Sequence, residues 1–248
     1  MCVKEYKNMV CIKLMSCEYF ILTKPKNDDV SSNGNNQIIN VNRLMFILPS
    51  NNMSYYENHG LFESNLIDWS KQFCFSNKIT LDIGAHSGTY SLCLANRSQH
   101  VYSFEPQKMT YYSLCGSVAL SNLKNVTCHN FGLGSQEQVG EKELFIVSND
   151  GGGSTLIKNQ SPVLSTETVT IRTLDSLQLK NVGFIKMDVE ENELNVLKGA
   201  VETLKNSNYP TILFESNDRN EELFNFIKQL SYNIIQVSGV NNMFLATH

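Results

Sequence analysis

Acidic side chains stand at the ends of short apolar runs in several parts of this sequence. Glu105 follows "HVYSF", Asp188 lies near the end of "FIKMDV" with Glu190 just beyond it, and Glu215 ends "TILFE". Asp82 lies in a similar position within "TLDIGAHSGTY". Carboxylates in such places can accept hydrogen bonds from ligand hydroxyls, pair with a cation or take up a proton during catalysis. Mg²⁺ and Ca²⁺ prefer the same oxygen atoms, so a metal site is an alternative.

A glycine-containing turn lies beside the first of these carboxylates. Gly84 and Gly88 enclose Ala85 and His86 at residues 84–88, where an apolar run changes into a helical pattern. Glycine lets a chain turn tightly and approach a ligand closely, and the following helix offers free N–H groups. The turn lacks the GxGxxG pattern of dinucleotide sites, and the chain lacks a phosphate-binding GKS/T sequence. NAD and P-loop nucleotides are therefore disfavoured.

Apolar runs and helical patterns alternate through most of the chain. This alternation predicts a mainly parallel sheet covered by helices, and the two closing runs, with no helix between them, predict an antiparallel C-terminal hairpin. A helix is also expected within 58–74, where Phe62, Leu66, Trp69 and Phe73 recur at helical spacing, and another shortly after Pro106, with Tyr111, Leu114, Cys115 and Val118 on one face. The expected strands are 79–83, 100–104, 126–130, 184–189, 211–215, 232–237 and 243–247.

The predicted sheet brings the acidic strand ends together, because ligands of such folds bind beyond the carboxyl ends of the strands. Glu105 lies 21 residues after Gly84, about the distance at which an acidic residue meets ribose hydroxyls. Asp82 and Glu105 suit a ligand with an ammonium group and a ribose. S-adenosylmethionine has both, together with a sulfonium cation. Asn130 and Phe131, after the third strand, are candidates for contact with its adenine.

Five segments resemble the FkbM-type S-adenosylmethionine-dependent methyltransferases: "LDIGAHSGTYSL", "VYSFEP", "IRTLDSL", "FIKMDVEENELNVLKGA" and "ILFES". The resemblance extends from about residue 57 to 237. It implies a Rossmann-like class I methyltransferase fold and methyl transfer to a hydroxyl of a sugar, a glycan or a similar small molecule. The chain departs from the family in having His86 in place of Asn and Glu191 in place of Gly.

The strand ends and the resemblance together give a site hypothesis. Asp188 or Glu190 would orient the acceptor hydroxyl and take its proton, with His86 as another candidate base. Glu191 and Glu193 are expected to be solvated, Glu215 could accept a hydrogen bond, and capping of a helix is the alternative role for Asp188 and Glu190. No metal is expected, and a Mg²⁺ or Ca²⁺ site on the acidic cluster is the alternative. The residues expected to bind the cofactor are Asp82, Gly84, Ala85, His86, Gly88, Glu105, Pro106, Asn130, Phe131 and Asp188.

Composition limits the remaining classes. The chain has 248 residues, a formal net charge of −4 and only four arginines, which does not favour a nucleic-acid partner. The seven cysteines form no CxxC pair, and neither a signal peptide nor a membrane span is recognisable, so a cytoplasmic location is expected. We expect a β-rich extension over 1–56 and the Rossmann-like domain over 57–248. The alternatives are an RNA or protein methyltransferase and a catalytically silent binding protein of the same fold.

Overall fold

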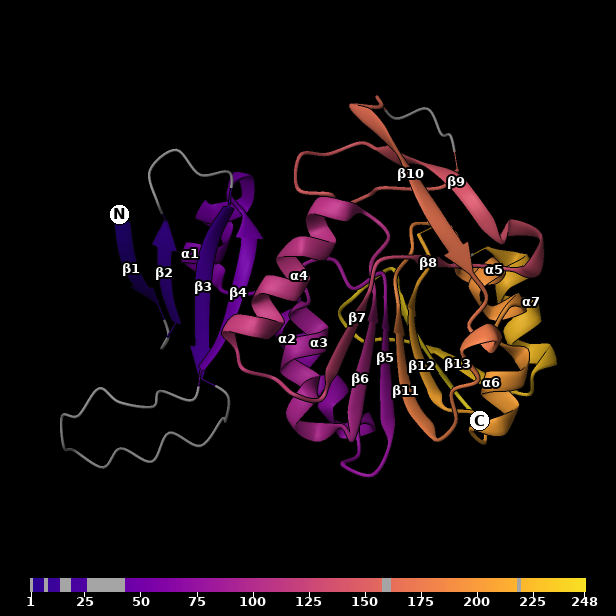
Figure 1. Cartoon of the computed structure of the whole chain (residues 1–248). Helices are drawn as coiled ribbons and strands as arrows, with labels where there is room; N and C mark the ends of the chain where they lie inside the picture. Colours follow the sequence, from indigo (N-terminus) through magenta and orange to yellow (C-terminus); the bar gives the residue numbers. More distant parts are fainter. Residues whose placement is uncertain (1, 7–8, 14–18, 26–42, 158–161, 218–219) are drawn as a thin grey trace.

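The computed structural model describes residues 2–6, 9–13, 19–25, 43–157, 162–217 and 220–248. A seven-stranded sheet in the order β13-β14-β12-β11-β5-β6-β7 forms its centre (Figure 1). Within this sheet, β12, β11, β5, β6 and β7 run parallel, and β14 pairs antiparallel with both β12 and β13. This confirms the predicted mainly parallel sheet and its C-terminal hairpin. The strands are β5 (Ile79–Ile83), β6 (His100–Phe104), β7 (Val126–His129), β11 (Val182–Met187), β12 (Thr211–Glu215), β13 (Asn233–Gln236) and β14 (Met243–Thr247).

Helices cover both faces of this sheet, and each face has its own apolar core. Phe184 and Leu213 pack toward α2 (Ser64–Ser70), α3 (Thr89–Leu94) and α4 (Lys108–Leu120), whereas their neighbours Ile185 and Ile212 pack toward α5 (Glu193–Lys198), α6 (Val201–Asn206) and α7 (Glu221–Gln229). Successive strand residues point to opposite faces, so strands that are apolar throughout serve both cores. Among the described residues, no helix is long and apolar enough to cross a membrane.

The N-terminal part forms a separate four-stranded antiparallel sheet in the order β1-β2-β3-β4. Its last strand, β4, lies against α4 (Figure 1). The backbone N–H groups of Met45 and Ile47 donate hydrogen bonds to the hydroxyls of Ser121 and Ser117, at 2.8 and 2.9 Å. A side chain at Gly116 would meet Ile47 at 2.5 Å. The strands are β1 (Cys2–Tyr6), β2 (Met9–Lys13), β3 (Tyr19–Pro25) and β4 (Arg43–Pro49).

The buried face of α4 differs from the apolar face that the sequence predicted. Leu114 is buried as expected, but Ser113 and Ser117 are buried too, while Tyr111, Cys115 and Val118 are only half-buried. Ser117 belongs in this face because β4 presents a backbone N–H group that needs an acceptor, whereas the hydroxyl of Ser113 donates to the carbonyl oxygen of Met109 in its own helix.

The segment 58–74, which was predicted as one helix, belongs to two helices. α1 (Met53–His59) crosses the predicted boundary at residue 56, and α2 begins at Ser64. Gly60 and Glu63 between them have positive φ angles of 80° and 53°, which a continuous helix does not allow. The expectation that Phe62 belongs to the apolar face of this helix is wrong: Phe62 lies in the connection and is 38% exposed.

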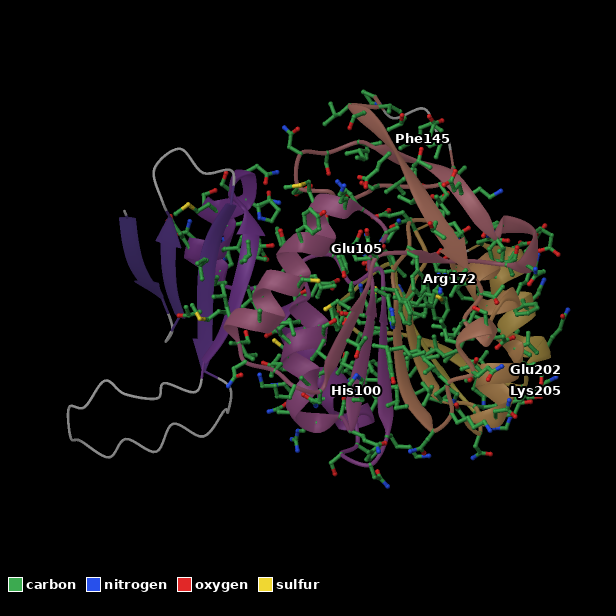
Figure 2. All side chains as sticks on the ribbon, in the orientation of Figure 1. His100, Glu105, Phe145, Arg172, Glu202 and Lys205 are labelled. Atoms are coloured by element: carbon green, nitrogen blue, oxygen red, sulfur yellow. The ribbon has the colours of Figure 1, made fainter. Side chains whose placement is uncertain are left out.

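A smaller sheet lies beyond the carboxyl ends of the central strands (Figure 1). It has the order β8-β10-β9 and is built from the long insertion before β11. Figure 2 labels His100 and Glu105 at the two ends of β6, and Glu105 lies at the end nearer this sheet. The strands are β8 (Gly132–Leu133), β9 (Gly140–Ile146) and β10 (Ser165–Arg172).

Candidate active site

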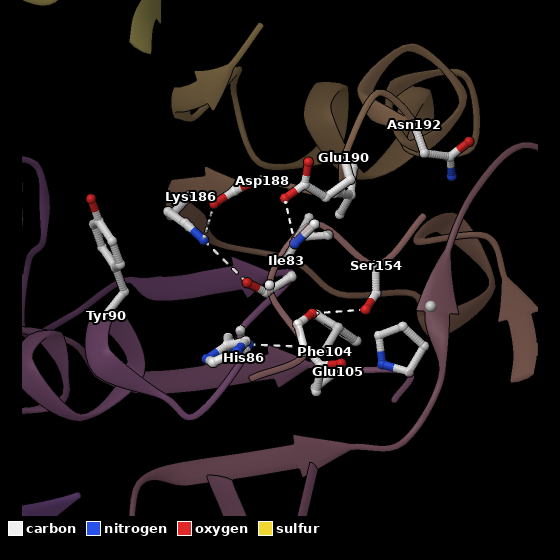
Figure 3. A pocket seen from close by; sticks show the side chains of 18 of the residues that line it. Ile83, His86, Tyr90, Phe104, Glu105, Ser154, Lys186, Asp188, Glu190 and Asn192 are labelled. Atoms are coloured by element: carbon white, nitrogen blue, oxygen red, sulfur yellow. Dashed lines mark hydrogen bonds and ion pairs between the residues drawn. The ribbon is translucent and has the colours of Figure 1, made fainter. Parts of the chain in front are cut away.

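A cavity of about 360 Å³ lies at the carboxyl ends of β5, β6 and β11. It falls within the size range of small-molecule sites. Seven of the residues predicted for the site line it, and Figure 3 shows five side chains of the cavity wall that carry or support its polar groups: His86, Glu105, Lys186, Asp188 and Glu190. Asp82, Gly88, Asn130 and Phe131 do not line it. The predicted residues that do are Gly84, Ala85, His86, Glu105, Pro106, Asp188 and Glu190.

The glycine turn fits between two strand ends. Gly84 has a φ of +77°, and a Cβ atom there would lie 1.8 Å from the carbonyl oxygen of Asp188. The N–H groups of Gly84 and Ala85 both donate to the carbonyl oxygen of Phe104, so the turn is tied to the end of β6. Gly88 has a φ of +88° and allows close packing on Leu114. Gly88 therefore serves the approach of α3 to α4 rather than the cavity wall.

Glu105 is held by the backbone around it. One carboxylate oxygen accepts the N–H of His86 and the other that of Gln107, both at 2.9 Å. Burial raises the pKa of Glu105 to about 7, against the effect of these hydrogen bonds. The side-chain amide of Asn130 donates to the carbonyl oxygens of Glu105 and Pro106, at 3.0 and 2.9 Å. Asn130 thus supports the loop that carries Glu105, and its predicted contact with adenine stays a prediction.

Asp82 lies beneath the cavity and is 1% exposed. One of its oxygens accepts hydrogen bonds from the backbone N–H and the hydroxyl of Ser91. The other has no hydrogen-bond partner among the described residues and lies 3.9 Å from the Lys186 ammonium. Burial raises the pKa of Asp82 even though Lys186 opposes this. Because Asp82 holds the start of α3, its contact with the cofactor also stays a prediction.

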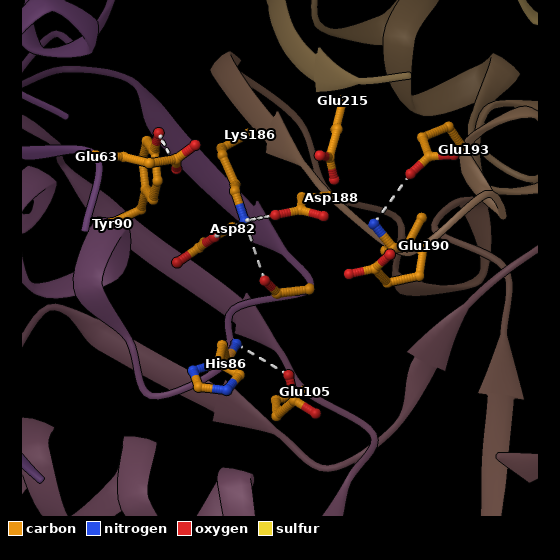
Figure 4. A network of polar contacts seen from close by, with 12 residues as sticks. Glu63, Asp82, His86, Tyr90, Glu105, Lys186, Asp188, Glu190, Glu193 and Glu215 are labelled. Carbon is orange, nitrogen blue, oxygen red and sulfur yellow. Dashed lines mark hydrogen bonds and ion pairs between the residues drawn. The ribbon is translucent and has the colours of Figure 1, made fainter. Parts of the chain in front are cut away.

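Lys186 was not among the predicted site residues. It is 5% exposed, and its ammonium lies 3.1 Å from the carbonyl oxygen of Gly84 and 3.4 Å from a carboxylate oxygen of Asp188 (Figure 4). Burial lowers the pKa of Lys186, but the charges of Asp188 and Asp82 raise it by more, so the net shift of the pKa is upward. A lysine inside the otherwise apolar run "FIKM" is the feature of the sequence that could have indicated this role.

Three carboxyl groups converge beside the cavity, and two of them, Asp188 and Glu190, line it. Asp188, Glu190 and Glu215 each offer an oxygen atom within 4.8 Å of the others (Figure 4). Burial opposes ionisation of Asp188, but Lys186 outweighs it and the net pKa is lowered. Burial and the adjacent Asp188 raise the pKa of Glu215 to about 9, so at neutral pH Glu215 keeps its proton and donates a hydrogen bond to Asp188. Oxygen ligands of this kind could hold Mg²⁺ or Ca²⁺, and the expectation of no metal remains a prediction.

Two consecutive residues after β11 adopt left-handed backbone conformations. The φ angles are 53° at Glu190 and 72° at Glu191, so Glu191 occupies a conformation that favours glycine, the residue expected there from the family pattern. Glu191 is exposed, as predicted. The prediction that Glu193 is solvated is wrong. Glu193 is 4% exposed, accepts the N–H of Val189 at 3.0 Å, and has a pKa raised by burial to about 7.

His86 joins the glycine turn to a loop that crosses the cavity. Its Nε2 donates to the carbonyl oxygen of Asp150 at 2.7 Å, and its Nδ1 lies 3.2 Å from the hydroxyl of Ser87. Burial lowers the pKa of His86, which favours the neutral ring. Since both ring nitrogens have protein partners, a role in positioning this loop is better supported than the predicted base role.

The loop over the cavity is fastened at its other side to Glu190. The N–H of Gly153 donates to the Glu190 carboxylate, and the hydroxyl of Thr155 donates to the Glu190 carbonyl oxygen, both at 3.0 Å. The hydroxyl of Ser154 also reaches the side chain of Gln107, at 3.2 Å. Residues 150–154 therefore connect all the strand ends that surround the cavity.

The apolar wall near Glu105 comes mainly from the insertion. Leu133, Leu144 and Ile171 of the β8-β10-β9 sheet line the cavity beside Phe104. Phe131 lies behind this wall, in contact with Phe104 and beneath the guanidinium of Arg172, which is 4.8 Å from the Phe131 ring centre. The sequence pattern did not identify the wall because its residues come together only through the pairing of distant strands.

A known protein family matches more than half of this chain. The family model for the methyltransferase FkbM domain matches residues 82–234. The methyltransferase sdnD of Sordaria araneosa is 30% identical over 123 residues, which cover 48% of this chain and 47% of sdnD. The chain thus spans about half the length of that relative.

Solved structures also resemble this chain. Methyltransferase FkbM from Methylobacillus flagellatus KT superposes with a TM-score of 0.51 at 19% identity, covering 69% of this chain and 44% of that one. SMU.1697c from Streptococcus mutans, solved in complex with SAH, gives a TM-score of 0.47 at 13% identity, covering 73% and 93% of the two chains. The first likeness supports the fold, and the match over residues 82–234 supports the family. The chain therefore belongs to the FkbM methyltransferase domain family.

Proposed function

We propose that this protein is an S-adenosylmethionine-dependent O-methyltransferase whose acceptor is a hydroxyl of a sugar or a similar small molecule. The observation that carries the proposal is a single cavity with Glu105 and an apolar wall at one side and Asp188 and Glu190 at the other. Glu105 is of the residue type that accepts ribose hydroxyls, and the apolar wall suits adenine. The carboxylates suit the ammonium and sulfonium charges of the cofactor. The residues present therefore fit S-adenosylmethionine.

When bound, this cofactor supplies a methyl group that its sulfonium already makes reactive. The protein then has to align the acceptor oxygen and to exclude water from the cavity. Gly84 and Ala85 would hold the cofactor through close backbone approach, and Glu105 would hold the ribose. The loop 150–154, tied to both His86 and Glu190, would exclude water.

Asp188 is the group best suited to take the proton from the acceptor hydroxyl. The Lys186 ammonium keeps Asp188 ionised, whereas the neighbouring Glu215 keeps its own proton at neutral pH. A carboxylate in this state can orient a hydroxyl and accept its proton as the new bond to carbon forms. Glu190, whose pKa is raised by burial and by Asp188, would instead orient the acceptor.

Two measurements test the proposal. Calorimetry with S-adenosylmethionine reports cofactor binding, and mass spectrometry reports a gain of CH₂ on candidate sugars, glycans and RNA. We expect Asp188→Asn and Glu190→Gln to bind the cofactor more weakly than the wild type and to lose most turnover even at saturating cofactor. Glu202→Gln, which lies on the exposed face of α6, should behave as the wild type (Figure 2). Full turnover in both active-site variants would exclude the assigned roles. Failure of the wild type to bind S-adenosylmethionine would favour a silent binding protein.

A further inference from the structure

The segment that connects the N-terminal sheet to α2 forms one wall of the cavity. Asn52, Tyr56, Phe62 and Glu63 all line it, although none follows a strand of the central sheet. This wall adjoins the side of the cavity that holds Lys186 and Asp188, and Tyr90 connects the two. The Tyr90 hydroxyl donates a hydrogen bond to Glu63 at 2.9 Å, and the Lys186 ammonium lies 5.1 Å from the centre of the Tyr90 ring.

An exposed aromatic ring stands within this wall. Phe62 stacks on Tyr55, with ring centres 4.0 Å apart and planes inclined by 15°, and the ring of Tyr56 meets Phe62 edge-on at 5.0 Å. Phe62 is nevertheless 38% exposed and lines the cavity. Its partners fix the ring while part of it stays open to a ligand. We call Tyr55, Tyr56 and Phe62 the aromatic platform.

Oxygen acceptors stand around the aromatic platform. Glu63 adjoins it in sequence, and Asp150 lines the same cavity, where the side-chain amide of Asn52 donates a hydrogen bond to it. Hydrogen bonds from Ser148, Gly152 and Asn52 outweigh the effect of burial and lower the pKa of Asp150, which stays ionised. An aromatic ring beside carboxylates suits a ligand with an apolar C–H face and several hydroxyl donors.

The charge of this wall selects among such ligands. Glu63 and Asp150 lie on it, and the one Lys or Arg among the described residues that line the cavity is Lys186, which is already paired with Asp188. A phosphate-bearing ligand would face like charges with no free cation to receive it. A neutral sugar ring meets neither penalty.

We infer that the aromatic platform together with Glu63 is the acceptor subsite and that it binds an uncharged sugar ring, which stacks on Phe62 and donates hydroxyl hydrogen bonds to Glu63. This inference rests on the proposed function, because it assigns the acceptor for the same cavity. It also gives the N-terminal sheet a role: β4, fixed to α4 through Ser117 and Ser121, leads through residues 50–52 into α1 and the platform.

The test begins with the full-length protein and S-adenosylhomocysteine. An array of neutral mono- and oligosaccharides and nucleotide sugars is screened with and without that compound, and the tightest neutral sugar then becomes the probe for calorimetry. We expect Phe62→Ala and Glu63→Gln each to weaken binding of the probe by about tenfold or more, as for loss of an interface anchor. Phe62→Trp should retain binding.

Phe75→Ala is the matched control, since Phe75 is exposed but lies outside the cavity. It should bind the probe as the wild type does, and all variants should keep wild-type affinity for S-adenosylhomocysteine and wild-type thermal unfolding. The inference is wrong if the array retains no neutral sugar, if nucleotide sugars bind more tightly, or if Phe62→Ala binds the probe normally. Absence of S-adenosylhomocysteine binding would instead refute the proposed function. Binding of the sugar could still be measured by calorimetry without that compound.

Discussion

Replacement of Lys186 by Met is expected to destabilise the fold strongly. The ammonium of Lys186 is buried 3.4 Å from Asp188 and 3.9 Å from Asp82, and no other Lys or Arg among the described residues forms an ion pair with either carboxylate. Removing one partner of a buried charge pair leaves the other charge uncompensated, at a cost of about 3–5 kcal/mol. For a chain of this length, this corresponds to a fall in melting temperature of roughly 10 °C.

The pH dependence separates this explanation from a simple packing defect. In the wild type, the lowered pKa of Asp188 contributes stability above its unfolded pKa of about 3.9, and that contribution is lost as the pH falls through the folded pKa. In Lys186→Met, the hydrogen bond from Glu215 remains but the charge of Lys186 is lost, so burial should raise the pKa of Asp188 above its ordinary value. The variant should therefore gain stability as the pH falls, because the buried carboxyl can then take up a proton.

Urea unfolding of both proteins at about pH 7.5 and about pH 5 measures the difference directly. The gap between the two unfolding free energies should be largest at the higher pH and narrower at the lower. Lys205→Met is the matched control, since Lys205 is exposed and pairs with Glu202 on the surface of α6 at 3.2 Å; it should change stability by no more than about 1 kcal/mol. Equal midpoints for Lys186→Met and the wild type, or a gap that does not vary with pH, would refute the reasoning.

Three further predictions concern the turn after β11, the attachment of β4 and the cofactor side of the cavity. Glu191→Gly should raise the unfolding free energy by about 0.5–1 kcal/mol, because the φ of +72° is strained for any residue with a Cβ atom; a lower urea midpoint would contradict this. Ser117→Ala should lower the unfolding free energy by about 1–3 kcal/mol, since it leaves the Ile47 N–H without its acceptor, and an unchanged midpoint would exclude that role. Affinity for S-adenosylmethionine, measured by calorimetry, should fall as the pH drops below about 7, where Glu105 takes up a proton, and Glu105→Gln should abolish this dependence; a wild-type affinity independent of pH would argue against Glu105 as the ribose acceptor.

The sequence predicted the parallel strands well because each is a short apolar run followed by a polar turn. Those turns carry Gly84, Glu105 and Asp188, so both the side of the cavity attributed to the cofactor and the proposed base could be located from local pattern alone. The C-terminal hairpin was predictable for a similar reason, since no helical pattern separates its strands. Lys186 was missed because a buried lysine is rarely stable, and only the three-dimensional arrangement brings it the carboxylates that compensate its charge.

The remaining errors have a common physical cause, which is backbone geometry that side-chain periodicity does not report. The apolar spacing from Phe62 to Phe73 continues across a break in the helix, because Glu63 adopts a positive φ that its residue type does not reveal. The role of Ser117 and Ser121 as acceptors was not predicted, because the N–H groups that they accept belong to a strand about 70 residues earlier in the chain.

The two sides of the cavity therefore differ in how they are specified. The side attributed to the cofactor is built from residues next to strand ends, so its chemistry follows from segments of about ten residues. The side attributed to the acceptor depends on the attachment of β4 to α4 and on a turn at 60–63 that displaces Phe62 from a helix into the cavity wall. Substitutions at Phe62 and Glu63 should consequently alter acceptor choice while leaving the cofactor side intact, which makes these two positions the most direct route to the identity of the acceptor.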